Sequence, residues 1–158
     1  MVCYQYLNIS MIVQKLARIF LADDDEDDCI LFQDALNEIG RKNELVISKD
    51  GVELMNTLNE MVPPPPQVLF LDLNMPRKSG FECLKEIKEE EKFKDIPVVV
   101  FSTSRDRSYV DKTFQDGANF YALKPPSFEE LKKLIEEVLS IDFTNSPRTL
   151  DTYLIRVK

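Results

Sequence analysis

Short apolar runs that end in charged or hydroxyl side chains restrict the fold of this chain more than any other feature. The run at residues 18–22 is followed by Asp23 and Asp24, and the run at residues 68–71 is followed by Asp72. Such runs are typical of the fully buried strands of a parallel sheet. Because the ligands of an open α/β sheet bind outside the carboxyl ends of its strands, these acids are expected to share one crevice.

Two later runs add a hydroxyl and an ammonium group at the same edge of the sheet. Residues 97–101 are followed by Ser102, and residues 120–123 are followed by Lys124. Clustered carboxylates raise one another's pKa unless a cation neutralises them, and a hard divalent metal, most simply Mg²⁺, prefers such oxygen ligands. One carboxylate can then attack a phosphoryl group, while the lysine and the hydroxyl meet the phosphoryl oxygens. The set therefore indicates acyl-phosphate chemistry.

Strand patterns alternate with helical patterns along the chain, which predicts five βα units around a parallel sheet. These units place one doubly wound α/β domain over residues 16–141, with helices on both faces of the sheet. Residues 1–15 are interpreted as an N-terminal extension. Residues 142–158 are interpreted as a C-terminal tail that is too short to be an output domain. The apolar side chains of this tail favour packing against the domain or against a second copy, as in a homodimer.

Composition excludes several classes of function. The net charge of −8 would repel nucleic-acid phosphates, so direct nucleic-acid binding is not expected. The absence of histidine excludes histidine-ligated metals, Ser-His-Asp hydrolysis and a phosphohistidine on this chain, so a phosphoryl donor must be another molecule. Three cysteines without a CxxC pair fit a reducing compartment. Because neither a signal peptide nor a membrane span is recognisable, we expect a cytoplasmic protein without membrane contact.

Four motifs, in one order along the chain, are similar to those of a known family. They are Leu21 to Asp24, Leu71 to Pro76 with Gly80, Phe101 with Ser102, and Tyr121 to Pro125. On these motifs, residues 16–141 resemble the receiver domain of response regulators in two-component signalling, of the stand-alone type. The resemblance implies a five-stranded parallel sheet in the order 2-1-3-4-5, the flavodoxin-like receiver topology.

The resemblance also implies a phosphoacceptor and a metal site. Asp72 would accept the phosphoryl group. Asp23 and Asp24 would organise a Mg²⁺ site, with Asp24 as a direct ligand. Asp72 and the backbone carbonyl of Asn74 would complete the protein ligands. Asp25 falls one place beyond the metal-binding pair, so we expect it to face solvent or to lie behind the ligands.

Three further residues would form the switch in such a domain. Lys124 would pair with one phosphoryl oxygen, and Ser102 would swing to bond another. Tyr121 would report the change by turning inward, which would alter the surface formed by the fourth helix, the fifth strand and the fifth helix. The resemblance further implies a cis Lys124–Pro125 peptide bond, because the lysine must turn back into the crevice.

These roles describe a phosphorylation switch rather than an enzyme that turns over a substrate. A histidine kinase or a phosphotransfer protein would donate the phosphoryl group, and the phosphorylated form would bind an unidentified downstream protein differently. One alternative is a small-molecule phosphatase or mutase with an aspartyl-phosphate intermediate, although Asn74 stands where such enzymes usually carry a second acid. A flavin binder of the same topology is disfavoured by the acids after the first strand, and a non-phosphorylated interaction module is disfavoured by Asp72 and Lys124.

Overall fold

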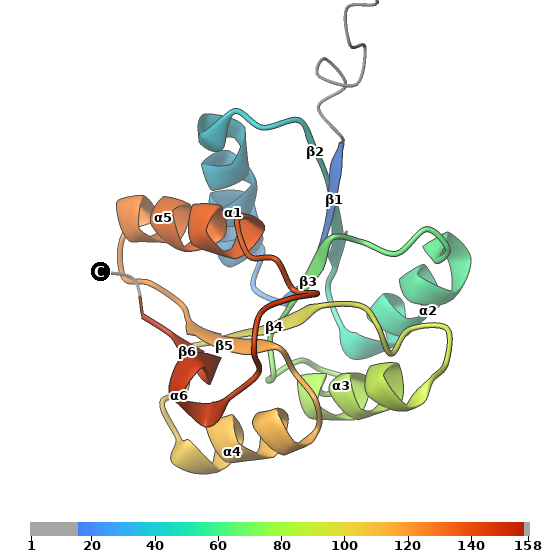
Figure 1. Ribbon diagram of the computed structural model, residues 1–158. Helices are drawn as coiled ribbons and strands as arrows, with labels where there is room; N and C mark the ends of the chain where they lie inside the picture. Colours follow the sequence, from blue (N-terminus) through green and yellow to red (C-terminus); the bar gives the residue numbers. More distant parts are fainter. Residues whose placement is uncertain (1–15, 157–158) are drawn as a thin grey trace, which may run out of the picture.

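The computed structural model describes residues 16–156, in which a parallel sheet lies between two layers of helices (Figure 1). The strands are β1 (Ala17–Ala22), β2 (Asn43–Ser48), β3 (Val68–Leu71), β4 (Val98–Ser102), β5 (Phe120–Leu123) and β6 (Leu154–Ile155). They lie in the order β2-β1-β3-β4-β5-β6, and every neighbouring pair is parallel. The predicted doubly wound fold and its strand order 2-1-3-4-5 are confirmed, with one strand added.

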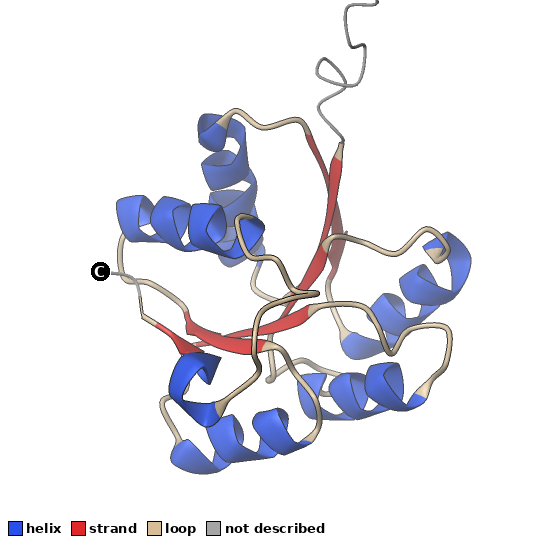
Figure 2. Cartoon of the chain, in the orientation of Figure 1, coloured by secondary structure: helices blue, strands red, loops and turns tan. Residues whose placement is uncertain are grey.

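Helices cover both faces of this sheet (Figure 2). One face carries α1 (Glu26–Ile39) and α5 (Phe128–Leu139), and the other carries α2 (Gly51–Met61), α3 (Gly80–Glu89) and α4 (Arg107–Gln115). Successive strand residues point to opposite faces. In β1, Ile19 and Leu21 enter the core under α1 and α5, while Phe20 and Ala22 enter the core on the other face.

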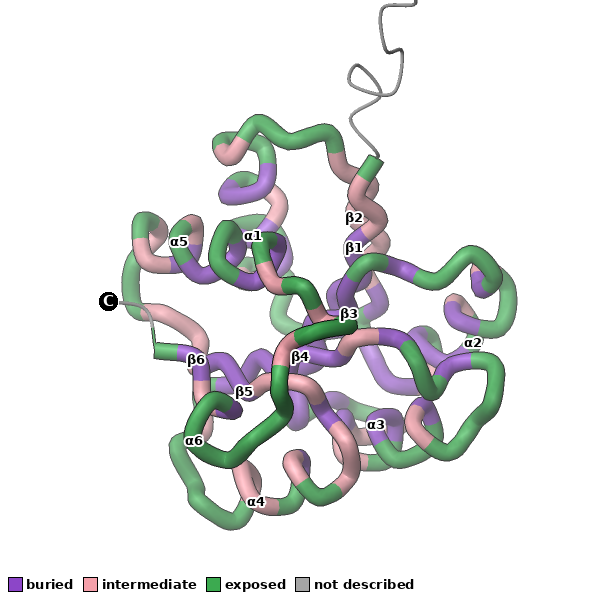
Figure 3. Tube along the Cα trace, in the orientation of Figure 1, coloured by how far each residue is buried: buried purple, intermediate pink, exposed green. Residues whose placement is uncertain are grey.

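The strands in the middle of the sheet are the most deeply buried part of the fold (Figure 3). Every residue of β3 and β4 is buried, whereas β2, at the edge, is mostly half-buried. Near-continuous apolar runs in the sequence therefore correspond to strands with helices on both sides. Within residues 16–156, no helix is both long and apolar enough to cross a bilayer.

Side-chain caps start the helices at the carboxyl edge of the sheet. Asp25 accepts a hydrogen bond from the backbone N–H of Asp28 at 3.0 Å and so caps α1. Ser79 and Glu82 form a reciprocal capping box that starts α3. Each cap satisfies N–H groups that would otherwise lack a partner and stabilises its helix by about 1 kcal/mol. Because these caps lie in the loops after β1 and β3, they hold the segments that carry the acidic residues.

The C-terminal tail extends the sheet, which corrects the prediction of five strands. After α6 (Leu150–Tyr153), the two residues of β6 pair in parallel with Tyr121 and Ala122 of β5. The side chains of Tyr153 and Ile155 are 1% and 8% exposed. The sequence predicts that the tail packs against the domain or against a second copy, but not that it pairs with β5, because a two-residue strand is too short to show an alternating pattern.

Candidate functional site

Three carboxylates meet at the carboxyl edge of the sheet, where the sequence predicts them. Asp23 and Asp24 follow β1, Asp72 follows β3, and these two strands are neighbours. One carboxylate oxygen from each residue lies within 4.8 Å of the other two. Asp23 and Asp72 are buried, whereas Asp24 is exposed to solvent. Such a group of oxygens, open on one side, fits a hard divalent cation that retains some of its water ligands.

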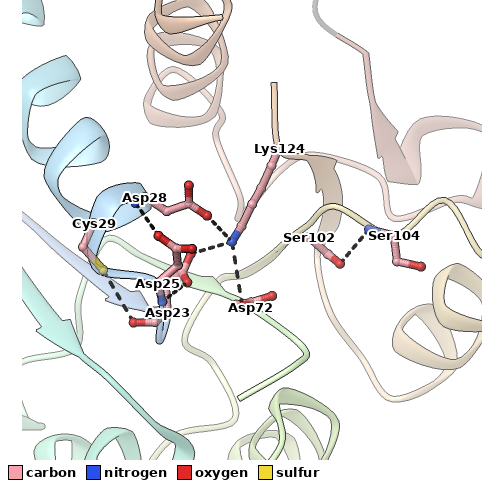
Figure 4. A network of polar contacts seen from close by, with 8 residues as sticks. All are labelled: Asp23, Asp25, Asp28, Cys29, Asp72, Ser102, Ser104 and Lys124. Atoms are coloured by element: carbon pink, nitrogen blue, oxygen red, sulfur yellow. Dashed lines mark hydrogen bonds and ion pairs between the residues drawn. The ribbon is translucent and has the colours of Figure 1, made fainter. Parts of the chain in front are cut away.

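Lys124 reaches this cluster from the end of β5 (Figure 4). Its Nζ lies 2.7 Å from Asp23 Oδ2, 2.8 Å from Asp28 Oδ2 and 3.8 Å from Asp72 Oδ2. The ammonium group donates hydrogen bonds to Asp23 and Asp28 and lies at ion-pair distance from Asp72. Acids from two neighbouring strands and from α1 therefore share one lysine.

Burial shifts the protonation equilibria of these groups. Burial raises the pKa of Asp72 from 3.8 to about 6, against the opposing effect of the Lys124 charge. Burial also raises the pKa of Asp23, and the hydrogen bond from Lys124 offsets this rise only in part. For Lys124 itself, burial would lower the pKa, but the bonds to Asp23 and Asp28 outweigh burial and raise it. One lysine thus leaves negative charge in the cluster that a divalent cation can balance.

Ser102 and Tyr121 lie beside the acids on β4 and β5. The hydroxyl of Ser102, which is fully buried, accepts a hydrogen bond from the backbone N–H of Ser104 at 3.1 Å. Tyr121 is also buried, and its hydroxyl donates a hydrogen bond to the backbone carbonyl of Ser104 at 2.8 Å. Both side chains therefore contact the same residue of the loop that leads to α4.

The loop after β3 carries Asn74 next to the acid cluster. Backbone hydrogen bonds from Leu73 and Asn74 to the Asp72 carboxylate oppose the effect of burial on its pKa. Gly80 allows this loop to fold tightly, because a Cβ there would lie 2.1 Å from the backbone oxygen of Asp72. The loop therefore keeps the backbone of Asn74 beside Asp72, and its carbonyl as a metal ligand stays a prediction.

The Lys124–Pro125 peptide bond is not cis, which corrects the expectation drawn from the resemblance. Within residues 16–156 the cis bonds are Val62–Pro63 and Pro63–Pro64. With a trans bond before Pro125, Lys124 still reaches Asp23 at 2.7 Å. The return of the lysine into the crevice therefore does not require the cis isomer.

Asp28 is a member of the site that the sequence motifs did not single out. It lies in the first turn of α1, three residues after the N-cap Asp25, and it contacts Lys124 across 96 residues of sequence. Its position in the first turn was the available signal, because helical side chains point toward the helix N-terminus and hence toward the carboxyl edge of the sheet. Asp25 is exposed, which is one of the two positions expected for it, and it also caps α1, which the sequence did not predict.

Comparison with known proteins agrees with this geometry. The family model of the response regulator receiver domain matches residues 19–136. Response regulator Rcp1 of Synechocystis sp. is 34% identical over 126 residues, which cover 77% of this chain and 86% of that protein. A chemotaxis protein CheY homolog of Campylobacter jejuni is 29% identical over 124 residues, which cover 77% of this chain and 92% of that protein.

Solved structures show the same architecture. The phosphorylated cyanobacterial phytochrome response regulator RcpA superposes with a TM-score of 0.75 at 31% identity, over 84% of this chain and 98% of that one. The Mn²⁺-bound form of response regulator Rcp1 superposes with a TM-score of 0.71 at 31% identity, over 84% and 99% of the two chains. The chain therefore belongs to the response regulator receiver family and acts in phosphorelay signal transduction.

Proposed function

We propose that Asp72 is the residue that accepts the phosphoryl group, and that Asp23, Asp24, Asp72 and the carbonyl of Asn74 hold the Mg²⁺ ion that this transfer requires. The observation that carries the proposal is the convergence of Lys124 and the two acids that follow β1 on Asp72. Of the three clustered acids, Asp72 is the one that lies both beside the lysine and at the end of the central strand β3.

The protonation of Asp72 decides whether it can act as a nucleophile. With a pKa of about 6, a part of its population is protonated near neutral pH, and a protonated carboxyl group cannot attack phosphorus. A bound Mg²⁺ ion would supply positive charge that favours the ionised carboxylate and neutralises phosphoryl oxygens. Lys124, 3.8 Å from Asp72 Oδ2, favours the ionised form in the same direction.

In the transfer itself, a carboxylate oxygen of Asp72 forms a bond to phosphorus while the P–N bond of the donor phosphohistidine breaks. The imidazole of the donor leaves with the electron pair, and the product on this chain is an acyl phosphate. Lys124 would exchange its contact with Asp28 for a phosphoryl oxygen. Ser102 would turn its hydroxyl from the N–H of Ser104 and donate a hydrogen bond to another phosphoryl oxygen.

The donor is proposed to be a histidine kinase or a phosphotransfer protein, because this chain has no histidine of its own. The phosphorylated form would bind a downstream protein through the surface of α4, β5 and α5. The acidic charge of −8 disfavours nucleic acid as a direct partner. We assign the protein to the cytoplasm because its cysteines, without a CxxC pair, fit a reducing compartment. A small-molecule phosphatase finds no support among the relatives, which are response regulators.

Phosphorylation by acetyl phosphate, followed by intact-protein mass spectrometry, tests this function. Wild-type protein with Mg²⁺ is expected to gain one phosphoryl group, and excess EDTA is expected to prevent it. Asp72→Asn and Asp24→Ala are expected to prevent it as well. Asp25→Ala is the matched control, because Asp25 is an exposed acid next to Asp24 in the sequence. Its removal costs about 1 kcal/mol of stability through the loss of the cap of α1, and labelling is expected to persist. Labelling of Asp72→Asn at the wild-type level, or labelling that persists in EDTA, would refute the assignment.

A further inference from the structure

The loop between β3 and α3 contains a strained residue. Arg77 has a φ of 66°, in the left-handed region, and within residues 16–156 it is the one residue other than glycine that does. A Cβ is disfavoured in this region because it approaches the following carbonyl oxygen. Both ends of the loop are fixed, since Met75 is buried and the N–H of Gly80 donates a hydrogen bond to the carbonyl of Leu73 at 2.9 Å. The chain therefore has to turn back between these anchors, and Arg77 makes the turn.

An ion pair holds Arg77 in this conformation. Its Nη1 donates a hydrogen bond to Asp50 Oδ2 at 3.1 Å. The other oxygen of this carboxylate, Oδ1, accepts a hydrogen bond from the N–H of Glu53 at 2.9 Å and caps α2. Pairs of mobile surface side chains contribute little, largely because both must lose rotational freedom. Here the cap already fixes Asp50, whose side chain is 12% exposed, so the pair can restrain the loop.

The pair of Asp50 and Arg77, which we call the clamp, closes a series of contacts around the acid cluster. The N–H of Asp23 donates to the carbonyl of Ser48, at the end of β2, at 3.0 Å. The N–H of Asp72 donates to the carbonyl of Ala22, at the end of β1, at 2.9 Å. The loops after β2, β1 and β3 are thus tied in that order. The clamp joins the first of these loops directly to the third.

The start of α2 packs closely against the same loop. At Gly51, the first residue of α2, a Cβ would lie 2.2 Å from the backbone oxygen of Lys78 and 2.7 Å from Cys83 Sγ. The backbone next to Arg77 therefore rests on the helix that Asp50 caps. Asn74, whose carbonyl is the proposed metal ligand, lies three residues before Arg77 in this loop. A loop released from the clamp would carry that carbonyl with it.

We propose that Asp50 and Arg77 are positioning residues of the metal site, and that their ion pair stabilises the strained turn that keeps the carbonyl of Asn74 beside Asp72. The inference rests on the proposed function, because it concerns the Mg²⁺ ion of the acid cluster. Neither residue of the clamp is a metal ligand.

Charge and position have opposite effects at Arg77. Its guanidinium repels a nearby cation, so removal of the charge alone would strengthen Mg²⁺ binding. Removal of the clamp would weaken Mg²⁺ binding, because the loop would no longer hold its ligand in place. The sign of the change in affinity therefore separates a positioning role from a simple electrostatic one.

Titration of the full-length protein with Mg²⁺, followed by the amide NMR signals of residues 72–75, tests the clamp. Arg77→Gln is expected to bind Mg²⁺ about five-fold more weakly than the wild type. Asp50→Asn keeps a capping side chain and is expected to show a similar loss. The double variant is expected to lose less than the product of the two single losses, because both remove one interaction. The matched control is Lys78→Gln, which removes the neighbouring positive charge without touching Asp50 and is expected to bind at least as tightly as the wild type.

A second amide variant separates the strain from the ion pair. Arg77→Asn also removes the charge, but asparagine adopts the left-handed region more readily than glutamine does. This variant is expected to lose less Mg²⁺ affinity than Arg77→Gln. Hydrogen exchange in EDTA gives a measurement that needs no metal. The amides of Lys78 and Gly80, which donate to carbonyls within the loop, are expected to exchange about five-fold faster in Arg77→Gln than in the wild type.

The outcomes distinguish the clamp from the metal site itself. Mg²⁺ binding by Arg77→Gln that is as tight as in the wild type or tighter, or loop amides that exchange at the wild-type rate, would overturn the clamp. Equal losses in the two amide variants would overturn the role of the strained turn. A wild type that binds no Mg²⁺ at the acid cluster would overturn the proposed function, and with it the role of the clamp in metal binding.

Discussion

Asp72→Asn is expected to stabilise the metal-free protein, because it removes a buried charge and keeps the shape of the side chain. The pKa of Asp72 rises from 3.8 in the unfolded chain to about 6 in the folded protein. At roughly 1.4 kcal/mol per pKa unit, ionisation of this group costs the folded state about 3 kcal/mol at pH 8. The Asp72 side chain is 10% exposed, so water screens little of this cost. The pKa of about 6 already includes the attraction to Lys124, so we expect a net gain of about 1–3 kcal/mol.

The dependence of this gain on pH follows from linkage. Because the folded-state pKa is the higher one, the folded protein binds the proton more tightly than the unfolded chain does. The destabilisation is therefore absent below the unfolded pKa of 3.8, grows between 3.8 and about 6, and is complete above about 6. Asp72→Asn lacks this titration. Its advantage over the wild type is expected to decrease by about 2 kcal/mol between pH 8 and roughly pH 4.5.

Urea unfolding in EDTA, followed by far-ultraviolet circular dichroism at several pH values, measures this difference. Added Mg²⁺ is expected to reduce it, because the ion stabilises the ionised wild-type site. Asp34→Asn, a change at an exposed carboxylate of α1, is the control and is expected to change the unfolding free energy by less than about 0.5 kcal/mol. An Asp72→Asn protein no more stable than wild type at pH 8, or a gain that does not vary with pH, would refute this account of the site.

Three other outcomes follow from the structure. Lys124→Ala is expected to leave phosphorylation of Asp72 by acetyl phosphate possible, but to abolish the shift of the Tyr121 amide signal that beryllofluoride, a phosphoryl mimic, induces in NMR spectra. Ser102→Ala is expected to reduce that shift by a smaller amount. An unchanged shift in both variants would contradict the proposed switch. Deletion of residues 144–158 removes the buried side chain of Tyr153 and is expected to lower the free energy of unfolding by ~3 kcal/mol or more. Labelling of Asp72 by acetyl phosphate is expected to remain intact. A truncated protein that folds but cannot be labelled would contradict this. Burial lowers the pKa of Lys88 to about 8, so the charged lysine destabilises the folded state below that pH. The free energy of unfolding of the wild type is expected to rise between about pH 7 and pH 9.5, and Lys88→Met is expected to remove part of this rise. An identical dependence of the unfolding free energy on pH in both proteins would show that the lysine stays fully charged in the fold.

The helix caps and the strand ends are the parts of this protein that the sequence by itself determined. Strand periodicity and capping residues such as Asp50 and Ser79 are local signals, which neighbouring residues impose on the backbone. In a parallel sheet all strands point the same way, so their polar ends meet at one edge. This rule brings Asp23 and Asp72 together without any knowledge of the packing.

Tertiary structure alone decided how these groups are partnered. The contact of Lys124 with Asp28 joins residues 96 apart, and it depends on how α1 packs against the end of β5. The sixth strand and the burial of Tyr153 against α4 depend on an edge that exists only once the sheet has formed. Local sequence patterns specify which face of an element is apolar. They do not specify which distant side chain forms a hydrogen bond with a given group, because those contacts depend on how the whole domain packs.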